Sequence, residues 1–373
     1  MMLKVLHLIP SLKKGGAERI LLDICTELEK RENIKVVIVT FRKENDYKFL
    51  SENLIIKIIP SSLKLSITRK NESNVKELSE FIYSFKPDVI HSHLFETEII
   101  LSQINYSRAK YFVHVHDTMK QLLKPRLRSP LNKLLITNAF ERRKVLKSYK
   151  KKHVTFISIS KHTFRFIKKN LPSNFKNILL HNAINTSRFT NTTPFSERVQ
   201  NKLIMIGSLV EKKGQKLAIE TINELKNRGI ECHLDILGDG PLRKSLEQFT
   251  QELQVETLIK FYGNVDHPEH FLAKASIYLH TASFEPFGLV IIEAMASGVP
   301  VVSTDGYGNR DLINNGKNGF LINERNPKLI ADQIEILLRD KNIYLNIKNN
   351  AFNFSKNFDI YNYTDKLINI YNE

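Results

Sequence analysis

The sequence predicts an α/β protein made of two doubly wound domains with parallel sheets. Three observations support this fold class: short apolar strands alternate with helical segments, the alternation occurs twice, and a polar stretch at 186–200 separates the two sets. Buried strands that alternate with helices are typical of parallel sheets covered on both faces. A chain of 373 residues is long enough for two such domains, each with its own core.

In the first half, apolar runs predict strands, and amphipathic runs at 16–31 and 74–85 predict the clearest helices. The strands are expected at 4–9, 35–40, 88–93, 110–116, 153–160 and 176–184. The second half repeats the pattern, with strands at 202–208, 232–238, 259–264, 276–281 and 299–304. A short helix is expected between the last two, in the run "LVIIEAMAS".

The net charge of +17 is unevenly distributed along the chain. Residues 1–200 hold 37 Lys and Arg against 17 Asp and Glu, whereas residues 201–373 hold 19 against 22. The segment 118–176 has 17 basic residues and one acid, Glu141. Such a face suggests an anionic membrane surface, a nucleic acid or an acidic substrate as partner. A lysine-rich composition offers the alternative of a merely solvated surface, but it does not explain why acids avoid one half.

The cysteines and the N-terminus indicate the compartment. Cys25 and Cys232 lie far apart and show neither a disulfide framework nor metal-ligand spacing, which fits a reducing cytoplasm. The stretch "MMLKVLHLIPSL" lacks a small-residue cleavage site, so we interpret it as the first buried strand. No run approaches the roughly 20 apolar residues of a spanning helix.

Loops at the carboxyl ends of the strands are where an open parallel sheet binds its ligands. The loop "KKGGAER" at 13–19 puts two glycines before a helix, whose amides can bind an anion, although Gly-Gly turns are more often structural. The glycine spacing of a dinucleotide-binding fingerprint is absent. In "GSLVEKKG" at 207–214, Lys213 is either a phosphate ligand or a surface charge.

Histidines end two of the predicted strands. His116 ends "VHVHD", and His91 and His93 end "DVIHSH". A histidine at a strand end is more often a structural group than a catalyst. A mononuclear zinc site stays open as an alternative, although no other residues show zinc-ligand spacing.

Two glutamates flank the turn in "SFEPFGLVIIEAMASGVPVVST" at 283–304. Backbone amides at the start of the following helix can bind a diphosphate without a basic side chain; they belong to Phe287, Gly288 and Leu289. Glu293 is placed to accept hydrogen bonds from ribose hydroxyls, and Glu285 to contact a sugar. The alternative is a capping acid and a solvated one.

These segments together resemble the retaining glycosyltransferases of family 4, which have the GT-B fold. "EPFGLVIIEA" has the family's E-x7-E form, with Glu285 and Glu293. Other family segments are matched in the same order over nearly the whole chain: "GGAER", "VHVHD", "HNAINTSRF", "GSLVEKKG", "LGDGPL", "FYGNV" and "SGVPVVSTDGYGNRDLINNGKNGFLI". The chain departs from the family at Ser208, where arginine is usual, and at Ala183 and Asn185, where glycine and aspartate are usual.

The resemblance implies a fold and a reaction. It implies two Rossmann-like domains facing a central cleft, with an acceptor-binding domain at 1–185, a linker at 186–200 and a donor-binding domain at 201–356. A C-terminal helix at 357–373 should pack back on the first domain. The donor should be a UDP- or GDP-sugar whose anomeric configuration is retained, and neither a cofactor nor an essential metal is expected.

The resemblance also assigns roles to residues. His116, Glu285 and Lys213 are the predicted catalytic residues: His116 should lie near the donor sugar, Glu285 should contact its hydroxyls, and Lys213 should neutralise the departing diphosphate. Since Ser208 carries no charge, Lys213 is the basic candidate of its loop. The predicted donor-binding residues are Gly16, Lys213, Val265, Glu285, Phe287, Gly288, Leu289 and Glu293.

The expected acceptor is a glycan or a lipid-linked glycan, as in lipopolysaccharide, O-antigen or capsule assembly. The basic segment 118–176 would hold a cytoplasmic protein at the anionic inner face of the membrane. In this segment Phe164, Phe166 and Ile167 are expected to insert shallowly between Arg165, Lys168 and Lys169. The alternative is that these apolar side chains are core.

Two other functions stay open on the sequence. One is a GT-B-fold epimerase or hydrolase of nucleotide sugars, which would form product without an acceptor. The other is a non-enzymatic nucleic-acid binder. We expect no nucleic acid as partner, because neither a helix-turn-helix signature nor an RNA-binding aromatic motif is present.

Overall fold

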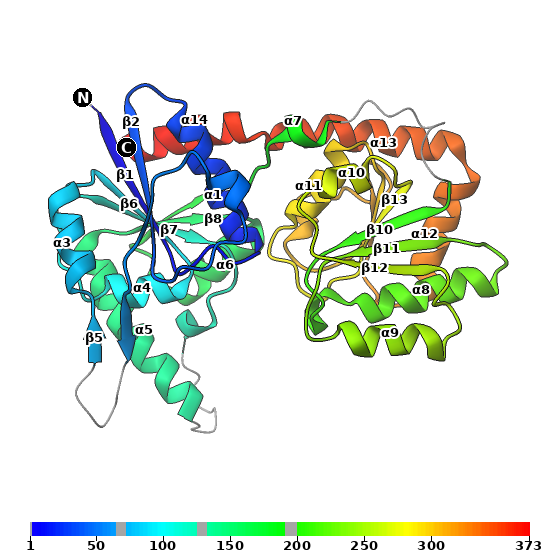
Figure 1. Cartoon of the computed structure of the whole chain (residues 1–373), viewed down its shortest axis with the longest axis horizontal. Coiled ribbons are helices and arrows are strands. Elements are labelled where there is room, and N and C mark those ends of the chain that lie inside the picture. Colours follow the sequence, from blue (N-terminus) through cyan, green and yellow to red (C-terminus); the bar gives the residue numbers. More distant parts are fainter. Residues whose placement is uncertain (1, 65–71, 125–132, 191–199) are drawn as a thin grey trace. The chain divides into compact units, whose positions relative to one another are not determined.

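The computed structural model describes residues 2–64, 72–124, 133–190 and 200–373. They form two compact units, which Figure 1 shows coloured along the chain. The first unit contains Met1–Asn182 and Ile360–Glu373, and the second contains Ala183–Asp359. The expected linker at 186–200 begins with helix α7 (Thr186–Phe189), and its residues 191–199 lie outside the described part of the chain. The acceptor and donor roles of the two units remain predictions.

The first unit is built on a parallel sheet in the order β3-β2-β1-β6-β7-β8-β9. The pairing is in register: His7 lies beside His91, and His93 lies beside His114. The strands are β1 (Leu3–Ile9), β2 (Ile34–Thr40), β3 (Ile56–Ile58), β6 (Val89–His93), β7 (Lys110–Val115), β8 (Thr155–Ser158) and β9 (Lys176–Leu179). The antiparallel pair β4 (Ser62–Lys64) and β5 (Glu72–Asn74) lies outside this sheet.

Helices connect and cover these strands. They are α1 (Gly16–Glu29), α2 (Lys48–Ser51), α3 (Lys76–Phe85), α4 (Phe95–Leu101), η1 (Lys120–Leu122), α5 (Lys133–Lys152) and α6 (Lys161–Asn170). The C-terminal helix α14 (Ile360–Asn372) returns to this unit and lies beside α1, as Figure 1 shows in red and blue. Arg31 Nη2 lies 2.9 Å from Asp365 Oδ1, and Lys110 Nζ donates to the Tyr371 carbonyl at 3.0 Å. These bonds anchor the end of the chain.

The second unit has a parallel sheet in the order β12-β11-β10-β13-β14-β15. Its strands are β10 (Lys202–Ile206), β11 (His233–Leu237), β12 (Ile259–Gly263), β13 (Ile277–His280), β14 (Val301–Thr304) and β15 (Phe320–Ile322). Its helices after α7 are η3 (Glu211–Lys213), α8 (Gln215–Asn227), α9 (Arg243–Glu252), α10 (Pro268–Leu272), α11 (Leu289–Ala296), η4 (Asn309–Asp311), α12 (Pro327–Arg339), α13 (Lys341–Ser355) and η5 (Lys356–Phe358).

Each unit buries its own apolar core, with Leu6, Ile90 and Phe156 in the first and Leu203, Ile236 and Val302 in the second. The strand order reverses between β1 and β6 in the first unit and between β10 and β13 in the second. Such a reversal leaves a crevice at the carboxyl ends of the two central strands, where doubly wound sheets bind ligands. The loops after these strands are therefore the places to look for chemistry. Among the described residues, no helix is both long and apolar enough to cross a bilayer.

Candidate active site

The loop after β10 carries Lys213 toward the end of β13. Lys213 ends the short helix η3, and Gly214 follows with φ of 70°, a left-handed conformation that favours glycine. A Cβ atom on Gly214 would lie 2.1 Å from the Thr281 carbonyl oxygen. Any side chain there would therefore push η3 away from β13. This close approach brings the ammonium group of Lys213 to the loop that follows β13.

Lys213 and Glu285 form a buried ion pair. Lys213 Nζ lies 2.6 Å from Glu285 Oε2, and the side chains are 19% and 9% exposed. Burial acts to raise the pKa of Glu285, but the charges and hydrogen bonds of Lys213 and His280 together outweigh burial and hold this pKa well below its usual range. Glu285 is therefore a carboxylate at neutral pH. The structure thus brings two predicted catalytic residues into direct contact.

His280 and Tyr278 extend this pair into the sheet. His280 Nε2 lies 3.5 Å from Glu285 Oε2, and its Nδ1 lies 3.3 Å from the Tyr278 hydroxyl. Burial, followed by the charges of Glu285 and Glu293, raises the pKa of Tyr278, so both glutamates act on this hydroxyl. His280 was not among the predicted site residues. The sequence held only a weak signal, since His280 is the next-to-last residue of the predicted strand 276–281.

The loop at 305–309 fixes the backbone of Glu285. The Glu285 amide donates to the Gly306 carbonyl at 2.8 Å, and the Gly308 amide donates to the Glu285 carbonyl at 2.9 Å. Asn309 holds this loop, because its Oδ1 accepts from the Gly306 amide at 2.9 Å and its Nδ2 donates to the Thr304 carbonyl at 2.8 Å. The position of the carboxylate therefore depends on a buried asparagine 24 residues further along the chain.

Helix α11 begins where the sequence predicts a diphosphate-binding turn. Gly288 is its N-cap residue with φ of 105°, and no side-chain cap occupies this helix start. Phe287 is 2% exposed, so only its backbone can meet a ligand, and Leu289 is the first helical residue. The amides of the first turn of a helix have no partner within the helix and attract anions. Glu293, 7% exposed, lies on the same helix.

Val265 follows β12, on the far side of β11 from the ion pair in the sheet order. It is half-buried, between exposed Asn264 and Asp266. The turn before it is fixed, because the Gly238 amide donates to the Gly263 carbonyl at 2.7 Å. The structure places Val265 at the carboxyl end of the sheet, and its contact with a base remains a prediction.

In the glycine loop of the first unit, the Glu18 side chain covers the helix start at which Gly16 is predicted to bind a phosphate. Gly15 is the N-cap of α1, and its amide donates to the Tyr47 hydroxyl at 3.0 Å. The Glu18 side chain folds back over this turn, since a Cβ on Gly15 would lie 2.3 Å from Glu18 Oε2. Burial raises the pKa of Glu18 to about 7. A carboxyl group therefore lies at the helix start where Gly16 is predicted to bind a phosphate.

His116 lies at the end of a buried row of histidines. His116 Nε2 is 2.8 Å from His93 Nδ1, and His93 Nε2 is 3.0 Å from His7 Nδ1. The rings of His114 and His116 stack with centroids 4.2 Å apart. His116 is 9% exposed, whereas the other rings are fully buried. His116 is thus the member of the row that can meet a ligand.

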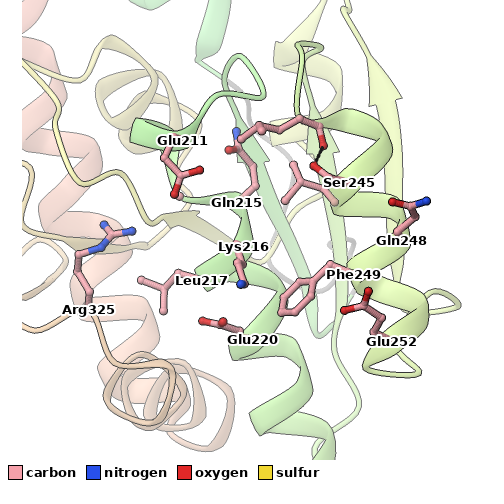
Figure 2. Close-up of a pocket in the computed structure, with 13 residues that line it drawn as sticks. Glu211, Gln215, Lys216, Leu217, Glu220, Ser245, Gln248, Phe249, Glu252 and Arg325 are labelled. Carbon is pink, nitrogen blue, oxygen red and sulfur yellow. Dashed lines mark hydrogen bonds between the residues drawn. The ribbon is translucent and has the colours of Figure 1, made fainter.

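A pocket of about 490 Å³ lies between α8 and α9 in the second unit (Figure 2). Its charged lining is mostly acidic, with Glu211, Glu220 and Glu252 against Lys216 and Arg325. This lining includes none of the predicted site residues and is unsuited to a diphosphate because acids outnumber bases. We therefore do not assign the pocket to the donor.

In the basic segment 118–176, the structure contradicts part of the predicted membrane-inserting surface. Ile167 is 1% exposed and belongs to the core of the first unit, with Phe166 packed against it. The expectation that Ile167 inserts into a membrane is therefore wrong, because α6 turns this side chain toward the sheet. Arg142 also serves the fold, since its guanidinium donates to the carbonyls of Leu122 and Asn170. Residues 125–132 lie outside the described chain.

Two family models match the chain, one in each half. "Glycosyltransferase Family 4" matches residues 14–188, and "Glycosyl transferases group 1" matches residues 192–354. The chain is a glycosyltransferase of the family 4 type. The glycosyltransferase is 25% identical over 364 residues to an uncharacterized glycosyltransferase of Methanocaldococcus jannaschii, which covers 94% of this chain and 93% of the relative.

A second relative has a named activity. The glycosyltransferase is 24% identical over 368 residues, 94% of each chain, to the N-acetylgalactosamine-N,N'-diacetylbacillosaminyl-diphospho-undecaprenol 4-alpha-N-acetylgalactosaminyltransferase of Campylobacter jejuni. Among solved structures it resembles Anabaena HepE in complex with UDP-glucose, with a TM-score of 0.80, 20% identity and 98% of each chain covered. The predicted GT-B fold with two Rossmann-like domains is confirmed.

Proposed function

We propose that this glycosyltransferase moves a sugar, with retention of its anomeric configuration, from a UDP- or GDP-sugar to a lipid-linked glycan in bacterial surface polysaccharide assembly. The observation that carries the proposal is the Lys213–Glu285 pair beside the start of α11. A cation, a carboxylate and free helix amides are the groups that a nucleotide-diphosphate sugar needs: positive charge for the diphosphate and an acceptor for sugar hydroxyls.

In the structure, Glu285 neutralises Lys213, the cation that a diphosphate would require. Donor binding therefore has to exchange one anionic partner of Lys213 for another. A diphosphate carries more charge than one carboxylate, and the amides at the start of α11 add to its stabilisation. Once released from Lys213, Glu285 can accept hydrogen bonds from sugar hydroxyls. We propose that this exchange aligns the sugar for transfer.

During transfer, negative charge develops on the departing nucleotide diphosphate. Lys213 and the α11 amides stabilise that charge from fixed positions, which is the most effective form of electrostatic catalysis. We propose that the attacking hydroxyl approaches on the same face as the leaving phosphate, which preserves the configuration. The chemistry requires no metal in this proposal, because the cation and the amides supply the positive charge. Turnover in excess EDTA, compared with added Mg²⁺, tests this point.

The proposed roles of the other residues follow the family resemblance. Glu293 would bind the ribose, Val265 the base, and Gly16 a donor phosphate. His116 would lie next to the donor sugar. For Gly16 the structure adds a condition: Glu18 has to leave the helix start before an anion binds there. A protonated Glu18 carries no charge and gives way to an anion more readily than its carboxylate.

We propose a lipid-linked acceptor because the Campylobacter jejuni relative acts, by its name, on a diphospho-undecaprenol glycan. The first unit offers a second reason. Leu135 and Ile136, in the first turn of α5, are each 40% exposed, and exposed cations follow along this helix: Arg143, Lys147, Lys150 and Lys151. Apolar side chains beside cations suit the surface of an anionic membrane. The proposed docking face is therefore α5 rather than α6.

A donor screen tests the proposed function. Purified protein is incubated with UDP- and GDP-sugars, with and without extracted lipid-linked glycans, and nucleotide release is measured. We expect one donor to be consumed only when an acceptor is present. Consumption without any acceptor would point to an epimerase or hydrolase and would overturn the proposal.

A further inference from the structure

Five histidines lie on one face of the first unit's sheet. His7 lies on β1, His91 and His93 on β6, and His114 and His116 on or just after β7. Alternate residues of a strand face the same side, and register places neighbours of adjacent strands together. Ring centroids of His7, His91 and His93 lie 4.7–5.3 Å apart. The proposed sugar transfer uses only His116, so the other four need an explanation.

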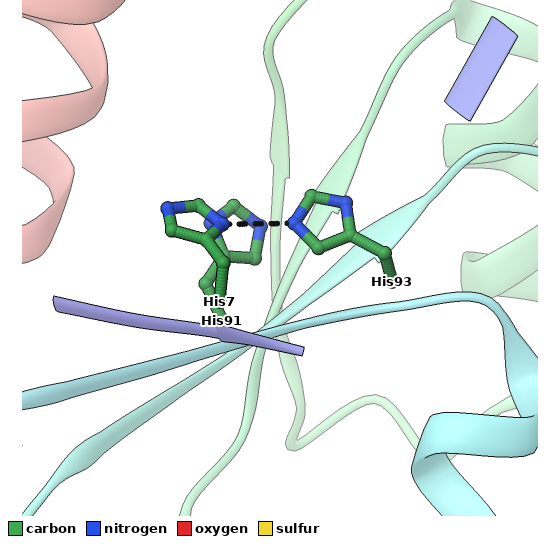
Figure 3. A group of neighbouring side chains, drawn as sticks. All are labelled: His7, His91 and His93. Carbon is green, nitrogen blue, oxygen red and sulfur yellow. Dashed lines mark hydrogen bonds between the residues drawn. The ribbon is translucent and has the colours of Figure 1, made fainter. Parts of the chain in front are cut away.

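We propose that His7, His91 and His93 form a binding site for one divalent transition-metal ion of the zinc class. One potential ligand atom from each ring lies within 4.8 Å of the other two, and all three side chains are 0% exposed. Figure 3 shows the three rings close together, with the His7–His93 hydrogen bond running between two of them. A zinc ion needs nitrogens at about 2.0–2.1 Å, so metal binding would require the three rings to turn toward a common point.

The second nitrogen of two of the three rings, His91 and His93, supports the site. A metal-binding histidine uses one nitrogen for the metal and donates from the other to a nearby acceptor. His91 Nδ1 lies 2.6 Å from the Tyr371 hydroxyl, while its Nε2 has no hydrogen-bond partner among the described residues. His93 Nδ1 bonds His116, which leaves Nε2 facing His7. Outer bonds thus orient two of the three rings with an Nε2 available.

The ligand type of the group also suits a transition metal, because all three side chains are imidazoles. Imidazole nitrogens suit Zn²⁺, Co²⁺, Ni²⁺ and Cu²⁺, whereas Mg²⁺ and Ca²⁺ prefer oxygen ligands. No carboxylate or thiolate belongs to this group of three.

The site would serve the fold and orient His116. A bound ion would join β1 to β6 at the reversal of strand order. With His93 Nε2 on the metal, the remaining proton of His93 must lie on Nδ1 and be donated to His116 Nε2. His116 would then carry its own proton on Nδ1. The ion takes no part in the proposed transfer chemistry, for which Lys213 and Glu285 lie in the other unit.

The experiment needs a background without surface binding, because exposed His267 and His270 with Glu269 form another potential metal group. The untagged full-length double variant His267→Asn/His270→Asn is therefore stripped of metal and titrated with Co²⁺ alone. We expect one equivalent to bind with visible d–d absorption, and the Zn²⁺ form to show three imidazole nitrogens by X-ray absorption. We also expect Zn²⁺ to raise the Tm, because a ligand that binds only the folded state stabilises it.

Adding His91→Gln to this background should abolish the absorption and the Tm shift, while adding His233→Gln, an exposed histidine of the second unit, should leave both unchanged. If the protein with His91→Gln fails to fold, the Co²⁺ titration of the His267→Asn/His270→Asn variant still shows whether a buried metal site exists. Less than 0.2 equivalents bound at roughly 100 μM free Co²⁺, or coordination dominated by oxygen, would overturn the proposal. So would binding that disappears with His267 and His270.

Discussion

Lys213 Nζ lies 2.6 Å from Glu285 Oε2, although 72 residues separate the two in the chain. One side chain follows β10 and the other follows β13, the two strands between which the sheet order reverses. The pair is therefore a product of the fold, and it holds a cation and a carboxylate ready in one place. A nucleotide-diphosphate sugar needs both, but it has to separate them to bind.

Lys213 can be tested against its neighbour. Lys213→Ala should reduce kcat/KM for the donor by roughly 10- to 150-fold, since a hydrogen bond to a charged group contributes about 1.5–3 kcal/mol. Lys212→Ala is the matched control, because Lys212 is exposed in the same short helix and should lose less than about twofold. Steady-state kinetics measures both variants. Equal losses would show that the loop, not the Lys213 charge, matters.

The two glutamates should separate kinetically. Glu285→Gln should lower kcat by roughly 10- to 150-fold, because a hydrogen bond from a sugar hydroxyl to a charged acceptor is lost. Glu293→Gln should mainly raise KM for the donor, by about tenfold, if it holds only the ribose. Wild-type kcat/KM in both variants would remove these residues from the site.

Glu18 should make stability depend on pH. Its pKa is raised to about 7 by burial, so between roughly pH 4 and 7 the unfolded chain has lost a proton that the folded chain keeps. The free energy of unfolding should therefore fall as the pH rises through this window. Glu18→Gln removes the effect and should be more stable than wild type at pH 8 but not at pH 4. Urea denaturation measures this.

The control for Glu18 is Glu32→Gln, an exposed position in the same unit. We expect its difference from wild type to stay constant between pH 4 and 8. A Glu18→Gln curve parallel to wild type over the same range would contradict the buried position of this carboxyl group.

Membrane docking should depend on α5. Replacing its four exposed cations with glutamine should weaken sedimentation with anionic vesicles and lower activity on a lipid-linked acceptor, whereas activity on a short soluble acceptor should survive; these cations are Arg143, Lys147, Lys150 and Lys151. Binding should also weaken as salt rises, because surface charges are screened.

The matched control removes four exposed lysines from the second unit: Lys244, Lys274, Lys317 and Lys341. This variant should keep wild-type vesicle binding. If both quadruple variants lose binding equally, net charge rather than a docking face is responsible. No binding of the wild type at low salt would end the docking hypothesis while leaving the transfer reaction untouched.

The sequence was sufficient for the fold because strand periodicity and strand-end loops are local signals. The strands around His7, His116 and Lys213 all lie where their apolar runs predict them. The sequence was not sufficient to predict which side chains contact one another in the site. The Lys213–Glu285 pair and the His7–His93–His116 row join residues from different strands, so they depend on register and on the order of strands in the sheet.

Ile167 shows a second limit. Its helix α6 alternates lysines with apolar residues, and this pattern is the same for a helix on a membrane and a helix on a core. Whether the apolar face of α6 meets a membrane or a core depends on what packs beneath the helix. In the structure Ile167 is buried in the core of the first unit. His280 was missed because a single histidine near the end of a strand does not by itself indicate a site. Its importance becomes clear only from its contact with Glu285 in the folded chain.

The configuration of the new glycosidic bond tests the central claim most directly. With the donor from the screen and its acceptor, proton NMR of the fresh product should show an anomeric coupling of the same type as in the donor, and released nucleotide should equal product formed. Retention agrees with a diphosphate held by Lys213 and the α11 amides on the face where the acceptor attacks. An inverted linkage at full turnover would contradict the account.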